Sequence, residues 1–324
     1  SVIELETVPT KRVYVGGTAR ADGVYDLVVD GLVVACGSVD GGHVLTIDAL
    51  TGASELTPGS SARVRFEGLG ESSKRVEIWL PHDEATELVA LHTDAPVEPA
   101  PPDPRPVWLH HGSSISHGSG ADRPTGTWPA VAAARADVSL VNLGLGGSAL
   151  LDACVARVLR DTPADLISLK IGINLVNTDV MRTRAFTPAV HGFLDTIRDG
   201  HPTTPLLVVS PILCPMHEHT PGPTALDLSA LGEGRLAFQA MGEPALGGSA
   251  RLTLAWIRDE LARIVAERAG SDPHLTYLDG RGLYGDTDAE RLPLPDGLHP
   301  DAETQRLIGE RFAARVPLLS APVG

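Results

Sequence analysis

An Asp/His pair near the end of the chain is the first feature that could do chemistry. Asp296 and His299 are three residues apart, so one tight turn could direct both side chains to the same point. A neutral histidine can take the proton from a serine hydroxyl, and a carboxylate fixes the tautomer of that histidine and stabilises the imidazolium. The pair therefore predicts a general base for a serine nucleophile. The plainer alternative is a turn in which Asp296 only caps a helix.

The serine that this base would activate is predicted in Gly112-Ser113-Ser114, with Ser114 as the nucleophile. Taken alone, a Gly-Ser-Ser segment is usually an ordinary turn, and Ser113 and Ser116 are alternative nucleophiles. His110, His111 and His117 flank this segment. Most such histidines are packing or surface residues, although one of them could line an acyl pocket.

Acyl transfer also needs N–H donors that meet the oxyanion of the tetrahedral intermediate. Two further segments offer such donors. Residues 142–147 contain three glycines, which let backbone amides approach a substrate closely, and Asn174 carries an amide side chain. Packing of the glycines and bonding of Asn174 to loop backbone are the alternatives to a catalytic role.

A folded domain must position these segments, and the sequence of residues 107–324 has the pattern of such a domain. Strands and helices alternate there, which predicts a three-layer α/β fold around a parallel sheet of five strands. In such a sheet ligands bind beyond the carboxyl ends of the strands, where the serine, the glycines, Asn174 and the Asp/His pair would gather. The predicted strands are 107–110, 138–142, 166–171, 206–210 and 275–278, and the helices 128–135, 149–160, 187–199, 251–268 and 302–314. Residues 212–250 show neither the helical nor the strand spacing of apolar residues, and they are expected to be a long loop that is functional or mobile.

Residues 1–95 have a different character and predict an all-β sandwich domain. Seven short strands are expected, and Asp30-Gly31 between two of them is a strong hairpin signal. The expected strands are 12–15, 24–29, 32–35, 43–47, 62–66, 75–80 and 87–92. Residues 96–106 are rich in proline and predict a semi-rigid linker. The expected domains are thus 1–95, the linker 96–106, and 107–324. The first domain is either a carbohydrate-binding or substrate-binding module or a rigid wall beside the site. Its few aromatic residues favour the wall.

The four segments, taken in order, resemble the sequence blocks of the SGNH (GDSL-like) hydrolases, some of which carry a β-sandwich module. The resemblance covers about residues 107–315 and implies a flavodoxin-like α/β/α domain, preceded here by a jelly-roll-like sandwich. It implies a triad of Ser114, Asp296 and His299, and an oxyanion hole formed by the N–H groups of Ser114 and Gly147 and the side chain of Asn174. Gly144 and Gly146 are alternatives to Gly147. The family uses neither a metal nor another cofactor. In two places the family often has an aspartate where this chain has Ser113 and Leu175.

Composition excludes several other classes of function. The net charge of −15, without a basic stripe, is unfavourable for nucleic-acid binding. No apolar run approaches the ~20 residues that cross a membrane. Three distant cysteines favour reduced thiols in a cytoplasm, and no signal peptide is visible, although a removed one would look the same. Cys214, His217 and His219 have no matching second cluster, so metal binding is not expected.

Three functions are compatible with these residues. The first is an esterase that removes an acyl group, such as acetyl, from a small hydroxylated molecule or sugar. The second is an acyltransferase that passes the same acyl group from a small acyl donor to an alcohol in secondary metabolism. The third, disfavoured because all three triad residues are present, is a catalytically silent carbohydrate-binding protein. The sequence does not distinguish a monomer from an oligomer.

Overall fold

A computed structural model describes residues 1–16, 21–48, 51–243 and 250–316. Contacts divide the chain into two compact units, each considered by itself. Unit 1 comprises Ser1–Asp103, Ala121–Gly126 and Leu228–Leu236, and unit 2 comprises Pro104–Gly120, Thr127–Asp227 and Ala237–Gly324. The two short segments of unit 1 lie far along the chain from residues 1–103, and no sequence pattern predicted their place. One of them is attached through Asp26, whose carboxylate accepts hydrogen bonds from the backbone and hydroxyl of Thr125.

Unit 1 contains two β-sheets that share one apolar core, as the sequence pattern predicted. One sheet has the order β5-β4-β1-β6 with β8 paired to β1, and the other has the order β3-β2-β7. The core between them includes Leu5, Tyr25, Leu27 and Phe66. The strands are β1 (Ile3–Tyr14), β2 (Val24–Val29), β3 (Leu32–Ser38), β4 (His43–Ile47), β5 (Ser54–Thr57), β6 (Ala62–Phe66), β7 (Val76–Trp79) and β8 (Ala85–Thr93).

The strand predictions for unit 1 hold except at two places. The hairpin between β2 and β3 has positive φ at both Asp30 and Gly31, as a type I′ turn requires. The prediction of a first strand at residues 12–15 was wrong in length, because β1 begins at Ile3. Ile3 and Leu5 of β1 face the core, and Glu4 and Glu6, on the opposite face of the strand, form ion pairs with arginines of β6. Strand β5 was missed, because all four of its residues are exposed and show no alternation.

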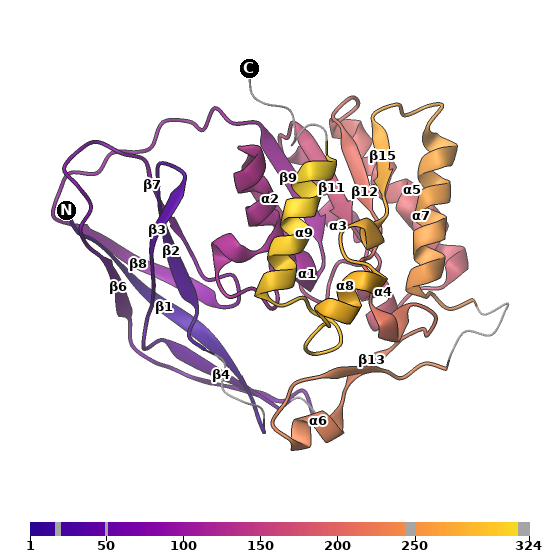
Figure 1. The fold of residues 1–324 in the computed structure, drawn as a ribbon, viewed down its shortest axis with the longest axis horizontal. Coiled ribbons are helices and arrows are strands. Elements are labelled where there is room, and N and C mark those ends of the chain that lie inside the picture. Colours follow the sequence, from indigo (N-terminus) through magenta and orange to yellow (C-terminus); the bar gives the residue numbers. More distant parts are fainter. Residues whose placement is uncertain (17–20, 49–50, 244–249, 317–324) are drawn as a thin grey trace. The chain divides into compact units, whose positions relative to one another are not determined.

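Unit 2 is a three-layer α/β/α structure (Figure 1). The five strands of its main sheet are all parallel and have the order β10-β9-β11-β12-β15. Numbered along this unit, the order is 2-1-3-4-5, which is the flavodoxin-like arrangement, with the switch point between β9 and β11. The strands are β9 (Val107–Gly112), β10 (Ser139–Gly144), β11 (Leu166–Lys170), β12 (Leu206–Val209) and β15 (Leu275–Leu278).

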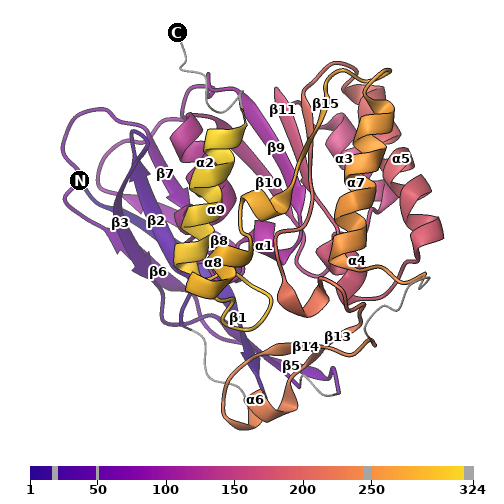
Figure 2. The same ribbon diagram turned by 45° about the vertical axis from the view of Figure 1, so that its right-hand side comes forward.

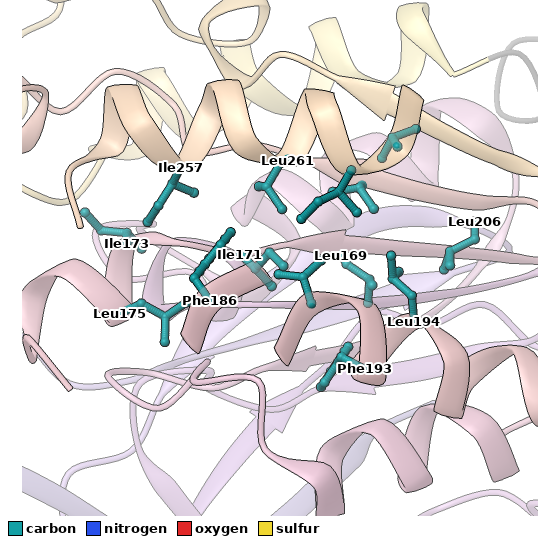
Figure 3. Packing of buried hydrophobic residues seen from close by; sticks show 14 of the residues in the cluster. Leu169, Ile171, Ile173, Leu175, Phe186, Phe193, Leu194, Leu206, Ile257 and Leu261 are labelled. Carbon is teal, nitrogen blue, oxygen red and sulfur yellow. The ribbon is translucent and has the colours of Figure 1, made fainter. Parts of the chain in front are cut away.

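Helices cover both faces of this sheet (Figure 2). On one face α2 (Trp128–Ala136) packs with α9 (Ala302–Arg315) over a core that contains Trp108, Trp128 and Phe312. On the other face lie α3 (Ala153–Asp161), α5 (Thr183–Gly200) and α7 (Leu254–Arg268). Figure 3 shows the apolar side chains that fill this second layer between α5 and α7, among them Phe186, Leu194 and Leu261.

Three of these helices begin elsewhere than the sequence pattern predicted. Helix α3 starts at residue 153 rather than 149, because Leu151 has a positive φ that a helix cannot contain. Helix α7 starts after Thr253, whose hydroxyl accepts a hydrogen bond from Trp256 N–H and so caps the helix. Helix α5 starts one turn earlier than expected and thereby buries Phe186 against Trp256.

The region from residue 212 to 250 is not the unstructured loop that its composition suggested. It contains the short strands β13 (Thr224–Leu226) and β14 (Phe238–Ala240), which pair antiparallel, and the short helix α6 (Leu228–Gly232). Residues 244–249 of the expected loop lie outside the described residues. No helix in the described part of the chain is long and apolar enough to span a bilayer.

Candidate active site

The predicted nucleophile lies at the carboxyl end of β9, beside the switch point of the sheet. The strand ends at Gly112, and Ser114 is the first residue of the short helix α1 (Ser114–His117). Gly112 cannot carry a side chain, because a Cβ there would lie 2.3 Å from Ser116 Oγ. The close turn that this glycine permits leaves Ser114 partly exposed at the edge of the sheet.

Ser114 is joined to the Asp/His pair by a chain of hydrogen bonds, although 185 residues separate it from His299. Ser114 Oγ lies 2.9 Å from His299 Nε2, and His299 Nδ1 lies 2.7 Å from Asp296 Oδ2. Because an ionised carboxylate can only accept, the proton of the neutral ring lies on Nδ1. His299 Nε2 is then an acceptor that faces the Ser114 hydroxyl, which is the arrangement a general base requires.

The Asp296 carboxylate is held in place by the turn that contains it. Its Oδ1 accepts hydrogen bonds from the N–H groups of Leu298 at 2.8 Å and His299 at 2.7 Å. Burial by itself raises the pKa of Asp296, but the hydrogen bonds and the charge of His299 outweigh burial and lower the pKa below its ordinary value. Asp296 is therefore ionised near neutral pH.

The expected oxyanion donors follow three neighbouring strands of the sheet: Ser114 comes after β9, Gly147 after β10 and Asn174 after β11. Ser114 N–H lies at a helix start, where backbone donors have no intrahelical acceptor. Gly146 and Gly147 occupy the centre of a turn closed by Ser148 N–H donating to Leu145 O, and neither donates to an acceptor among the described residues. A Cβ on Gly146 would lie 3.7 Å from Ser114 Cβ, so this turn adjoins the nucleophile. Both glycines stay candidates for the donor.

Asn174 follows β11, in the short helix α4 (Ile173–Asn177), and is 2% exposed. Its Oδ1 accepts a hydrogen bond from Ala149 N–H at 3.1 Å, so the amide group is oriented by the loop that follows β10. With the oxygen engaged, the amide nitrogen is the group left to donate to an oxyanion. Gly172 precedes α4 with φ +131°, and a Cβ there would meet Pro211 at 2.7 Å, so the approach of these loops requires glycine.

The alternative nucleophiles are engaged in other roles. Ser113 caps α1 by accepting a hydrogen bond from Ile115 N–H. Ser116 Oγ lies 2.9 Å from His110 Nε2, and the other ring nitrogen of His110 lies 2.7 Å from Ser168 Oγ. His110 is fully buried, and burial lowers its pKa well below the ordinary value, so the ring is neutral.

The other histidines and the cysteine of this region are likewise bound to protein groups. His111 is also buried, while His117 is exposed and its Nδ1 lies 3.0 Å from Gly144 O. The ring nitrogens of His217 lie 2.9 Å from Thr220 O and 2.7 Å from Thr224 Oγ1. Burial raises the pKa of Cys214 to about 12, so its thiol stays protonated. Neither His217 nor Cys214 is presented as a metal ligand.

Two residues that contact the site had no role in the sequence analysis. Asn142 donates to Ser116 O at 2.8 Å and accepts from Gly144 N–H at 3.0 Å, so it braces α1 against the loop after β10. Its place at the start of the glycine-rich segment 142–147 was a signal for this. The ring of Phe238 contacts the ring of His299, with centroids 5.8 Å apart. Nothing in the sequence around Phe238 indicated that contact.

The sequence pattern of the GDSL-like Lipase/Acylhydrolase family matches residues 111–307. The chain belongs to this family. The match spans all four segments identified above, from the end of β9 to α9, and it makes the protein a serine hydrolase or acyltransferase. No protein of curated function matches the chain in sequence.

Several solved structures share the fold over almost the whole chain. The salicylyl-acyltransferase SsfX3 from a tetracycline biosynthetic pathway is 24% identical, with a TM-score of 0.71 over 99% of this chain and 80% of its own. A GDSL-like lipase candidate from Bacteroides ovatus is 17% identical, with a TM-score of 0.63 over 98% and 81%. A family two carbohydrate esterase from Clostridium thermocellum, in complex with cellohexaose, is 13% identical, with a TM-score of 0.60 over 97% and 87%. The chain is similar to each in both its β and its α/β parts.

Proposed function

We propose that the protein is an esterase that cleaves a small acylated alcohol, for example an acetate ester, through an acyl-enzyme on Ser114. The observation that carries the proposal is the hydrogen-bonded chain from Ser114 Oγ through His299 to Asp296. Ser114 is the one serine of its segment that faces the His299 ring.

In the first half of the reaction, His299 Nε2 takes the Ser114 proton while Ser114 Oγ bonds to the ester carbonyl carbon. The oxyanion is met by the N–H of Ser114, by the N–H of Gly147 or its neighbour Gly146, and by the Asn174 amide. The intermediate then expels the alcohol oxygen, which receives the proton from His299. Asp296 stays ionised throughout and stabilises the imidazolium.

In the second half, a water molecule gives a proton to His299 Nε2 and attacks the acyl carbon. Collapse of the second intermediate breaks the bond to Ser114 Oγ, which takes the proton back, and the free acid leaves. The chemistry balances without a further reactant. The chain's own residues supply the nucleophile, base, acid and oxyanion donors.

The proposal is tested by p-nitrophenol release from acetate and butyrate esters at mildly alkaline pH. Loss of one triad residue typically lowers the rate about 10³- to 10⁶-fold, so Ser114→Ala should be inactive. Ser113→Ala and Ser116→Ala are the matched controls, because they remove neighbouring hydroxyls that do not face His299. Equal activity of Ser114→Ala and the wild type would contradict the proposal.

Transfer of the acyl group to an alcohol is the second candidate. The half-buried Phe238 ring in contact with His299 favours it, because an apolar ring next to the base disfavours water as the acceptor. The fold shared with a salicylyl-acyltransferase supports it as well. The test is product partitioning: with small alcohols present, a transferase forms new esters while p-nitrophenol release continues. An esterase forms the free acid alone.

A further inference from the structure

The β13–β14 hairpin lies outside the five-stranded sheet, between β12 and α7 in the chain. Its strands are short and pair antiparallel, with Thr224 opposite Ala240 and Leu226 opposite Phe238. Such a small hairpin is marginally stable by itself and must be held by its neighbours. The groups that hold it are parts of the candidate active site.

One strand of the hairpin is bound to the turn that carries the Asp/His pair. Phe238 N–H donates to Asp296 O at 2.9 Å. The Phe238 ring meets the His299 ring at 5.8 Å between centroids and an interplanar angle of 73°, an edge-to-face contact. Gly297, between the two triad residues, has φ +81°, and a Cβ there would lie 3.3 Å from Phe238 O. Both the backbone and the side chain of Phe238 therefore adjoin this turn.

The other strand is bound to the helix that carries Asn174. Thr224 Oγ1 donates to Asn177 Oδ1 at 3.0 Å and lies 2.7 Å from His217 Nε2. Asn177 is the last residue of α4, three positions after Asn174. The hairpin thus connects the Asp296–His299 turn with the helix of the expected oxyanion donor.

We propose that Phe238 is a positioning residue, which holds the His299 ring in line with Ser114, and that the β13–β14 hairpin acts as a clamp on this side of the site. The proposal rests on the proposed role of the Ser114–His299–Asp296 chain. His299 needs the correct ring rotation as well as the correct tautomer to face Ser114 Oγ. The hydrogen bond from Nδ1 to Asp296 holds one side of the His299 ring, and the edge-to-face contact with Phe238 limits the remaining rotation of the ring.

The size of the effect follows from the contact itself. The interaction energy of an aromatic pair, beyond that of its buried area, corresponds to a rate change of about 3- to 10-fold if the whole of it stabilises the transition state. Phe238→Leu keeps an apolar side chain and the backbone hydrogen bond but removes the ring. It should lower kcat about 3- to 10-fold with little change in KM. Phe238→Tyr keeps the ring and should retain wild-type kcat.

The experiment measures kcat and KM for acetate and butyrate p-nitrophenyl esters with both Phe238 variants. Met241→Ala is the matched control, because Met241 directly follows the same short strand and its side chain is exposed. Thermal unfolding of each variant shows that the fold is intact. An equal loss of kcat for both esters in Phe238→Leu, with rescue in Phe238→Tyr, supports the proposal.

Two results would overturn it: an unchanged kcat in Phe238→Leu, or a change in KM that depends on the acyl chain, which would make Phe238 a pocket wall rather than a positioning residue. Ser114→Ala separates this inference from the proposed function. If Ser114→Ala is inactive and Phe238→Leu is unaffected, only the hairpin inference fails. If Ser114→Ala stays active, the proposed function fails first.

Discussion

Replacing Asp296 by asparagine changes one atom of the site and tests how the His299 tautomer is set. In the wild type, Oδ1 accepts from two backbone N–H groups and Oδ2 accepts from His299 Nδ1. An asparagine can satisfy the two N–H groups only with its oxygen, so its NH₂ group must face His299 Nδ1. That group donates, which forces Nδ1 to accept and moves the ring proton to Nε2.

The Nε2–H would then point at Ser114, and the base could no longer take the serine proton. A wrong tautomer of this kind lowers kcat about 10⁴-fold, which corresponds to about 5 kcal/mol in the barrier. The backbone hydrogen bonds of the turn are kept, so stability should change little. The assay is p-nitrophenyl acetate hydrolysis together with thermal unfolding of the variant.

Asp301→Asn is the matched control. Asp301 is a nearby carboxylate whose Oδ1 accepts from Thr304 N–H and caps α9. Asparagine caps a helix about as well as aspartate, so this variant should keep wild-type activity and stability. Retention of a tenth or more of wild-type kcat by Asp296→Asn would refute the tautomer argument.

Three further predictions concern buried polar groups. Burial lowers the pKa of Lys170 from 10.5 to about 8. Below a pH of about 8 the side chain is charged in the folded protein, and its buried charge destabilises the fold. This destabilisation disappears as the pH rises towards 10.5. Lys170→Met should therefore raise the free energy of unfolding by about 3 kcal/mol near neutral pH and by less in alkaline urea titrations. Asn174→Ala should lower kcat about 10²- to 10³-fold with intact folding. His110→Phe removes the His110 partner of Ser116 Oγ and one of two partners of Ser168 Oγ, which still accepts from Trp108 Nε1. The change should cost about 1–3 kcal/mol in unfolding free energy, and an unchanged unfolding midpoint would contradict this.

The α/β domain could be predicted from the sequence because its signals are local and periodic. Each strand of the five-stranded sheet is short and mostly apolar, and the helices between them have apolar faces. The carboxyl ends of parallel strands meet at one edge, so the positions of Ser114, Asn174 and His299 followed from the order of the elements. The structure then supplied the distances that join Ser114 to His299.

Other features left no such signal. Strand β5 is an exposed edge strand, so its side chains do not alternate between a buried and an exposed face. The β13–β14 hairpin has three residues in each strand, too few for any period to be recognised. Phe238 contacts His299, which lies 61 positions further along the chain, and nothing in the sequence next to either residue indicates this tertiary contact. Helix α5 begins at Thr183 and contains Pro188 in its interior, whereas the sequence pattern favoured a start next to that proline.

The central claim is that Ser114 carries the acyl group during turnover, and trapping that intermediate tests it most directly. The protein would be mixed with p-nitrophenyl acetate, quenched in acid within the first turnovers, digested, and examined by mass spectrometry. We predict one added acetyl group on the peptide that contains Ser114, located on Ser114 by fragmentation and absent from the Ser114→Ala protein. An acetyl group on another serine, or the same labelling in Ser114→Ala, would contradict the account.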